Sequence, residues 1–269
     1  MRHRYRQGVE ELMSGILKTD LRRAFSGNFV FIMLGTIGVQ LLCMLDYFGY
    51  ELSSVIYLFE LTANIGKFTV LMPSVACLGY AGGYAADVNS GFITFEQLRT
   101  RFTPYCISKC ISAYVSAVCA VAAGMIGYSA ILTLMGAPFV DASTVEMLGY
   151  GKDFGALIGS GHAVLFWAMK VFFRAISCGA YAMLGLMLSA FIPNVFILRV
   201  MPFIVINISK YVMVALLHMN FSLYTLEYNG YPMEGALPNF IATTATFLLL
   251  ALLFAAIFCM TARRRHLNA

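Results

Sequence analysis

The sequence has little charge for its length. Only 12% of its 269 residues are Asp, Glu, Lys or Arg, while 60% are hydrophobic, and the mean hydropathy is +0.79. A typical soluble domain carries about 25% charged residues, because its surface must hold polar side chains. The low charge therefore excludes a water-soluble domain and indicates a polytopic membrane protein.

Six apolar runs are each long enough to cross the hydrocarbon core of a bilayer, which takes about 20 residues of helix. The runs cover residues 29–45, 62–86, 105–134, 172–192, 196–219 and 240–261. We therefore predict an all-α protein with a six-helix transmembrane domain over 29–261 and a basic tail over 262–269. Residues 1–28 are too long and too charged for a secretory signal, so we expect them to be retained.

Lys and Arg residues gather in alternate connections. They occur before the first run, within 88–105 and in the tail, whereas the other connections are mainly acidic. The positive-inside rule then places both termini and 88–105 in the cytoplasm. Basic ends also suit an anionic inner leaflet, so the net charge of +5 requires no nucleic-acid partner.

The segment before the first run carries apolar residues at near-helical spacing, with charges between them. This pattern, over residues 9–25, predicts an amphipathic helix that lies on the inner surface of the membrane. The alternative is a cytoplasmic tail that only helps to set the topology.

Three absences narrow the function. No GxxxxGK[ST] phosphate loop occurs, so we expect neither an ATP site nor a catalytic residue in this chain. No acidic residue falls inside a predicted span, which argues against an ion-coupled secondary transporter, because such proteins usually need an embedded carboxylate. The seven cysteines lie within or at the ends of the spans, and no cluster around Cys106 and Cys110 completes a metal site.

The segment VNSGFITFEQLRTRFTPY, residues 88–105, is charged and aromatic between two apolar runs. Thr94 and Gln97 form a capping-box pattern, and Pro104 prevents the helix from continuing, so a short helix of about two turns is predicted to start at Thr94 and to end before Pro104. One of its faces is apolar, and that face consists of Phe92, Phe95, Leu98 and Phe102. It packs either against the membrane core of the same chain or into a groove of another protein.

These features together resemble the permease subunit of bacterial ABC exporters of the ABC-2 type. The resemblance rests on six spans with cytoplasmic ends, a basic amphipathic segment that runs into LRRAFSGNFVFIML, and the loop NSGFITFEQLRTRFTPYCISKCISAYVSA with Ser90-Gly91 and Lys109. It covers almost the whole chain as architecture. Small exporters of amphipathic peptides, such as the phenol-soluble modulin exporters, look most similar.

The resemblance implies an export permease in a bacterial plasma membrane that moves a peptide, drug or lipid. It also implies a second permease copy, by symmetry a homodimer, and a separate ATPase subunit that holds ATP and Mg²⁺. Residues 92–103 would be the coupling helix that docks on this subunit. Its docking residues would be Phe92, Thr94, Phe95, Glu96, Leu98, Arg99, Arg101 and Phe102.

Polar residues in the fifth run are candidates for a substrate path. Asn207, Lys210, Tyr211 and His218 fall close to one helical face, and Lys210 lies about 18 Å from Leu198, near the middle of the membrane. Ionisable residues at this depth are usually functional. The alternative is a structural Lys210 bonded to backbone carbonyls or to Asn207.

Two further cations, Lys170 and Arg174, are expected at the outer rim of the membrane, where they snorkel beside Phe166 and Trp167. We expect residues 155–170 to form an outer-surface helix. A cavity shared by the cations of the spans would be positive and would favour an anionic or zwitterionic amphiphile.

An intramembrane hydrolase is the remaining alternative. The stretch GSGHA places Ser160 near His162, but residues two apart on a helix do not face each other, which argues against catalysis.

Overall fold

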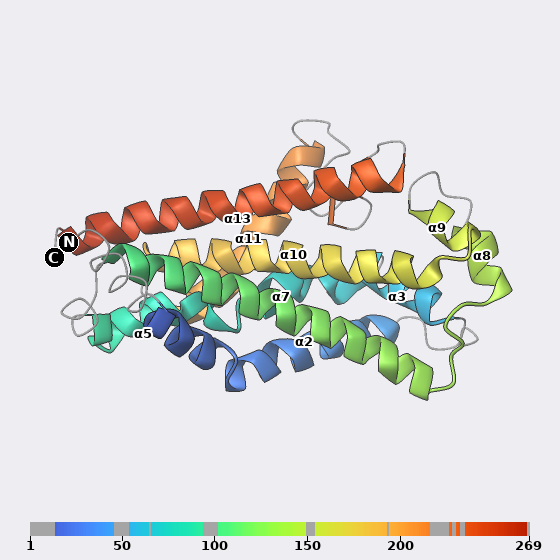
Figure 1. Ribbon diagram of the computed structural model, residues 1–269, viewed down its shortest axis with the longest axis horizontal. Coiled ribbons are helices and arrows are strands. Elements are labelled where there is room, and N and C mark those ends of the chain that lie inside the picture. Colours follow the sequence, from blue (N-terminus) through green and yellow to red (C-terminus); the bar gives the residue numbers. More distant parts are fainter. Residues whose placement is uncertain are drawn as a thin grey trace, which may run out of the picture.

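The fold is a bundle of helices. The computed structural model describes residues 14–45, 54–64, 66–93, 102–148, 154–192, 194–215, 226–227, 230–231 and 235–267. Throughout these ranges the regular structure is helical and no strand occurs. The long helices run side by side along one axis (Figure 1). The predicted all-α class is therefore confirmed.

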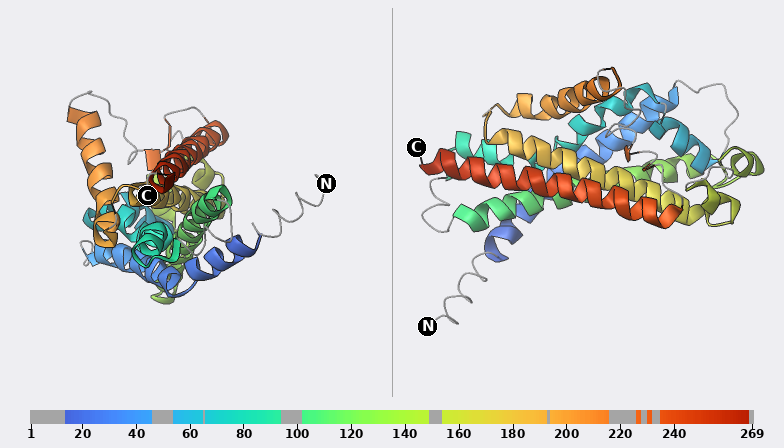
Figure 2. Two further views of the ribbon diagram at one scale, coloured as in Figure 1. Left: turned by 90° about the vertical axis from the view of Figure 1, so that its left-hand side faces the viewer. Right: turned by 90° about the horizontal axis from the view of Figure 1, so that it is seen from above.

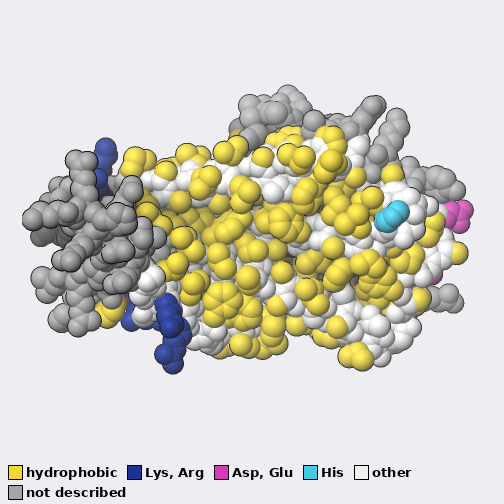
Figure 3. Space-filling model, viewed as in Figure 1, with side chains coloured by type: hydrophobic (Ala, Val, Ile, Leu, Met, Phe, Trp, Pro, Cys, Tyr) yellow, Lys and Arg dark blue, Asp and Glu magenta, His cyan; other side chains and the backbone are white. Residues whose placement is uncertain are grey.

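Four helices are long and apolar enough to cross a membrane. They are α2 (Gly27–Leu45), α7 (Phe102–Leu134), α10 (Ala163–Ser189) and α13 (Ala236–Leu267). They correspond to the first, third, fourth and sixth predicted runs, although α10 begins at Ala163 rather than at 172. Hydrophobic side chains cover most of the face shown in Figure 3, with cations near one end and acids at the other. This distribution fits a protein embedded in a bilayer.

The predicted span 62–86 is not one helix. The chain forms α3 (Val55–Asn64), bends by 57° into η1 (Lys67–Leu71) and α4 (Met72–Ala76), and continues through η2 (Tyr80–Gly82) into α5 (Gly83–Asn89). Pro73 stands in the first turn of α4, where it has no backbone N–H to give to a preceding turn. If the bent pair of α3 with η1–α4 counts as one span, the described residues hold five spans rather than four.

The fifth predicted run forms α11 (Val195–Ala215), which contains Pro202. Its part Val195–Ser209 is a shorter apolar helix than the four spans. In the two further views of Figure 2, α11 stands at the edge of the bundle, whereas α10 lies near its middle.

Helix α10 is the centre of the packing. It lies between α7 and α13 (Figure 1) and is buried on nearly all sides. Small residues such as Ser177, Gly179 and Ala180 let its neighbours approach closely. A Cβ at Gly179 would stand 2.8 Å from the ring of Tyr114 on α7.

The two ends of the bundle differ in chemistry. The basic end holds residues 14–24, α5, the start of α7 and the end of α13, while the acidic end holds α8 (Ala142–Leu148) and α9 (Gly155–Gly159) (Figure 1). Asp141 caps α8 by accepting the Thr144 backbone N–H at 2.9 Å. The hydroxyl groups of Thr144 and Ser143 also donate to it and hold the pKa of Asp141 below its usual value.

The outer helix expected over 155–170 is split. Helix α9 ends at Gly159, and α10 begins at Ala163 after a turn in which Gly161 has φ +82°. That left-handed conformation favours glycine, which explains why the helix cannot run through this point.

Close packing of α2 on α7 generates a first prediction. A Cβ at Gly124 of α7 would lie 2.6 Å from Thr36 Cβ and 2.8 Å from the Met33 carbonyl oxygen, both on α2. Gly124→Ala should therefore force the helices apart, cost about 1–3 kcal/mol and lower the thermal unfolding midpoint of the purified protein in detergent.

Gly38→Ala on α2 is the matched control, because a Cβ at Gly38 meets nothing within 4 Å. It should leave the midpoint unchanged or raise it slightly, since alanine favours helix. Equal midpoints for the two variants would show that α2 and α7 do not pack as described.

Candidate functional site

A buried ion-pair network lies at the basic end of the bundle. Lys109 of α7 is only 1% exposed. Its Nζ lies 2.9 Å from Asp20 Oδ1 and 2.6 Å from Asp87 Oδ2. Asp20 belongs to the helical residues 14–24, and Asp87 belongs to α5. One ammonium group therefore joins three separate stretches of the chain.

Hydroxyl groups complete this network, which we call the Lys109 network. Ser108 donates to Asp20 Oδ2 at 2.6 Å, and Tyr105 donates to Asp87 Oδ2 at 2.8 Å. Lys109 also donates to the Tyr80 hydroxyl at 2.6 Å, and Tyr80 in turn donates to Asp20. These bonds replace the water that the buried charges would otherwise require.

The charges of the network are balanced. Arg23 brings a second cation, whose Nη1 lies 3.8 Å from Asp87 Oδ1 at the surface. The ammonium group of Lys109 also lies 4.8 Å from the ring centre of Tyr80 and 5.2 Å from that of Tyr105. The carboxylates of Asp20 and Asp87 thus face two cations. Lys109, at the centre of the network, is the most deeply buried of the four charges.

The network stands at the base of the segment 88–105. Helix α5, which carries Asp87, leads into this segment, and α7, which carries Lys109, leads out of it. Both arms of the segment therefore start from the same ion pairs.

Two of the expected docking residues contact the rest of this chain. The Phe92 ring lies under the Arg23 guanidinium at 4.6 Å. Phe102 lies 6.1 Å from the Tyr105 ring and packs against the buried core. The other members of the expected set, Thr94, Phe95, Glu96, Leu98, Arg99 and Arg101, lie outside the described residues.

The expected path residues show local contacts. The Asn207 side-chain amide donates to the Phe203 carbonyl, 2.8 Å away in the same helix, and Tyr211 is 71% exposed. The backbone of Lys210 belongs to α11, while its side chain and all of His218 lie outside the described parts of the chain. Their role in a substrate path stays a prediction.

The snorkelling interpretation of Lys170 and Arg174 is wrong. Arg174 is buried, its Nη1 donates to Glu227 Oε1, and the Tyr181 hydroxyl donates to Glu227 Oε2 at 2.9 Å. The Lys170 Nζ lies 3.1 Å from Glu60 Oε1. Because α10 begins earlier than predicted, Arg174 lies about 17 Å along the helix instead of at its end.

Two carboxylates that lie outside the predicted runs are nevertheless buried in the bundle. Glu60 belongs to α3, one half of the bent pair that makes a candidate span, and residues 226–227 bring Glu227 into contact with α10. Both acids fall outside the predicted runs, which explains why hydropathy missed them. A positive cavity can no longer be inferred from Lys170 and Arg174, because each has an acidic partner.

Ser160 and His162 do lie together, contrary to the helical argument against them. Ser160 Oγ is 3.1 Å from His162 Nδ1, because the two residues flank a turn rather than share a helix. Ser160 Oγ is also 3.1 Å from the Leu157 carbonyl, which only accepts. The single hydroxyl proton can be donated to only one of these two neighbours, and the role of His162 Nδ1 depends on the imidazole tautomer.

The cysteines are all free thiols. Among the described residues, no group of three His, Cys, Asp or Glu side chains is arranged to hold a metal ion. No protein-family model matches this chain, and no curated protein or solved structure is significantly similar to it.

Sequence reasoning missed Asp20 and Asp87, although Lys109 was noted. Asp87 directly follows the predicted span 62–86, and Asp20 is an acid in an otherwise basic segment. An acid placed where the positive-inside rule favours cations was the available signal.

The Lys109 network generates a second prediction. Lys109→Met should leave two buried carboxylates without their common partner, which typically costs about 3–5 kcal/mol. The thermal midpoint in detergent should fall clearly. It should recover in part when Asp20→Asn and Asp87→Asn are added, because the three neutral side chains no longer require a counter-charge.

Lys18→Met is the control, since Lys18 is an exposed lysine on the same helical segment as Asp20. A Lys109→Met protein as stable as the control would contradict the network.

Proposed function

We propose that this chain is the permease subunit of an ATP-driven exporter, bound at its basic end by a separate ATPase subunit. The observation that carries the proposal is the Lys109 network, which ties both arms of the segment 88–105 to a long membrane helix. A partner that displaces this segment would pull on α5 and α7 together through short, buried ion pairs.

The packing supports transmission across the bundle. Helix α7 extends from the Lys109 network to Leu134 near the acidic end and packs along α10. Packed cores change between discrete arrangements rather than deform continuously. A displacement at the basic end is therefore expected to reach the acidic end as a shift of α7 against α10.

The remaining architecture follows from the proposal. The positive-inside rule puts the basic end in the cytoplasm of a bacterial cell. The bent pair and α11 then complete six spans, and residues 14–24 lie at the inner membrane surface. A second copy of the chain forms the other half, and the cargo is an amphipathic or hydrophobic peptide, drug or lipid.

The third prediction tests docking. Phe95→Ser with Leu98→Ser should abolish co-purification with the proposed ATPase subunit, because it removes apolar contacts from the coupling helix. Phe102 is left unchanged, since it packs against this chain's own core. ATP hydrolysis by the mixed subunits is the second readout.

Phe196→Ser is the matched control. Phe196 is an exposed aromatic residue at the start of α11, on the other connection at the basic end. If the Phe95 and Leu98 variant still bound the ATPase and supported normal hydrolysis, the docking site would not be here.

A proton-coupled secondary transporter is the second candidate. It is favoured by Glu60, a buried carboxylate paired with Lys170 of α10 inside the helix bundle. Arg174 and Glu227 line the same small pocket. Embedded carboxylates of this kind carry protons in many transporters.

The fourth prediction separates the two candidates. A proton carrier moves protons through its embedded carboxylate. The chain reconstituted alone in liposomes should then carry protons down an imposed pH gradient, which an entrapped pH-sensitive dye reports. Glu60→Gln should abolish this proton flux, whereas Glu146→Gln on exposed α8 should not.

A wild-type protein that carries no protons in this assay would exclude Glu60 as the proton carrier. The same result would leave the ATP-driven proposal intact.

A further inference from the structure

Three of the seven cysteines meet where the start of α7 passes the end of α13. Cys106 and Cys110 are buried in one apolar core, and Cys259 packs against the same core. The Cys259 thiol lies within hydrogen-bonding reach of both α7 thiols. One sulfur atom of α13 therefore faces two sulfur atoms of α7.

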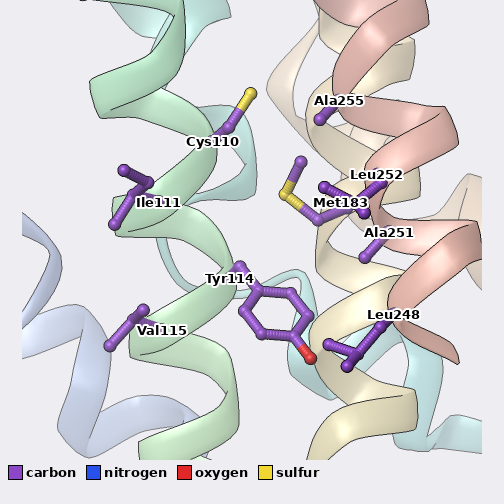
Figure 4. A pocket seen from close by; sticks show the side chains of 9 residues that line it. All are labelled: Cys110, Ile111, Tyr114, Val115, Met183, Leu248, Ala251, Leu252 and Ala255. Atoms are coloured by element: carbon purple, nitrogen blue, oxygen red, sulfur yellow. The ribbon is translucent and has the colours of Figure 1, made fainter. Parts of the chain in front are cut away.

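The register of the two helices explains why these thiols meet. Cys110 and Ala255 line the same apolar groove between α7 and α13, over Met183 of α10. In Figure 4 the Cys110 side chain leaves α7 on the side that faces α13. Helix α7 begins and α13 ends at the basic end (Figure 1), so the two helices are antiparallel. The residues one helical turn closer to that end, Cys106 and Cys259, therefore lie at the same level.

The geometry of helices decides which thiols are able to bond. A disulfide requires Cβ atoms about 3.5–4.5 Å apart. Residues four apart on one helix hold their Cβ atoms about 5–6 Å apart, so Cys106 and Cys110 do not bond to each other within α7. Cys259 approaches from another helix and is free of this restriction. A bond within the cluster therefore joins α7 to α13, and the three thiols are not arranged to hold a metal ion.

Both sides of this contact lie near the membrane surface. Cys106 is about 6 Å along α7 from Phe102, and Cys259 is about 12 Å along α13 from Leu267. When these helices are centred on a hydrocarbon core about 30 Å thick, about 10 Å of each end lies outside it. The cysteines thus fall within about 4 Å of the core boundary. Cys259 is partly exposed whereas the α7 thiols are buried, so an oxidant in the water meets Cys259 first.

We propose that Cys259 is the sensing cysteine of a redox site and that hydrogen peroxide converts it to a reversible disulfide with an α7 thiol, at Cys106 or Cys110. The positive-inside rule places this end of the bundle in the cytoplasm. Thiols are kept reduced there, and the disulfides that do form are usually transient and redox-sensing.

The oxidation proceeds in two steps. The Cys259 thiolate attacks one oxygen of hydrogen peroxide and the O–O bond breaks, which yields a sulfenic acid and a hydroxide that leaves with the thiol proton as water. An α7 thiol then attacks the sulfenic sulfur, the S–O bond breaks, and the hydroxyl leaves with the second thiol proton as water. The two thiols lose two electrons and two protons, and the peroxide gains both. A dithiol reverses the bond by two exchange reactions and is itself oxidised to a disulfide.

The bond would fix α7 to α13 beside the Lys109 network, because Lys109 directly precedes Cys110. Both helices also pack on α10, so the link opposes a shift of α7 against α10. Peroxide should therefore stop the transport cycle, and a dithiol should restore it. Only this consequence rests on the proposed function, whereas formation of the bond is tested on the chain alone.

The test uses the full chain in lipid nanodiscs, treated with hydrogen peroxide. Remaining thiols are blocked with N-ethylmaleimide, and the digested chain is mapped by mass spectrometry. A peptide that carries Cys259 should appear linked to the α7 peptide that carries Cys106 and Cys110, and dithiothreitol should release it. The thermal unfolding midpoint of the oxidised chain should rise, because the link closes a long loop of the chain.

Matched variants separate this site from the other thiols. Cys259→Ser should abolish both the link and the rise of the midpoint, whereas Cys119→Ser, at an exposed cysteine of the same α7, should change neither. Cys106→Ser with Cys110→Ser removes both resolving thiols. Dimedone, which traps sulfenic acids, should then label Cys259 in this variant more strongly than in the wild-type chain.

A Cys259 that stays a free thiol after peroxide treatment would overturn the inference. A link found only between two copies of the chain, at doubled mass on a non-reducing gel, would also overturn it. ATPase docking at residues 92–103 is measured separately, so failure of the proposed function leaves this result standing, and the reverse also holds.

Discussion

The structure depends on one electrostatic requirement, namely that a charge removed from water must have a partner. Lys109, Lys170 and Arg174 are each held against carboxylates from other parts of the chain. Burying an unpaired charge inside the bundle, away from water, costs several kcal/mol or more of folding free energy. The ion pairs therefore attach three segments to the core of the bundle, namely residues 14–24, α3 and residues 226–227. None of these segments can move away without breaking a buried pair.

The same ion pairs connect the segments that would have to move in a transport cycle. At the basic end the ion pairs join the arms of the segment 88–105, so a partner acting there would act on α5 and α7. Inside the bundle the pairs join α10 to α3 and to Glu227. A transport cycle that opens either end must break or exchange these ion pairs, so their stability sets how easily the bundle opens.

The position of α10 has a second consequence. Because α7 and α13 both pack on this central helix, they do not close fully on each other, and an apolar groove remains between them. The two helices thus leave a space between them above Met183 of α10.

Composition and hydropathy alone determined that the protein is helical and built for a membrane, and they located α2, α7, α10 and α13. Those features depend on local composition, since about 20 apolar residues in a row must cross the hydrocarbon core wherever the chain places them. The short helix predicted from Thr94, Gln97 and Pro104 rests on equally local signals but falls outside the described residues. Only the tertiary structure decided that α3 bends before η1 and that Lys109 meets both Asp20 and Asp87. It also decided that Glu60 and Glu227 neutralise Lys170 and Arg174. These partners are separated by tens of residues, and sequence spacing cannot show which distant charges a folded bundle will bring within a few ångströms.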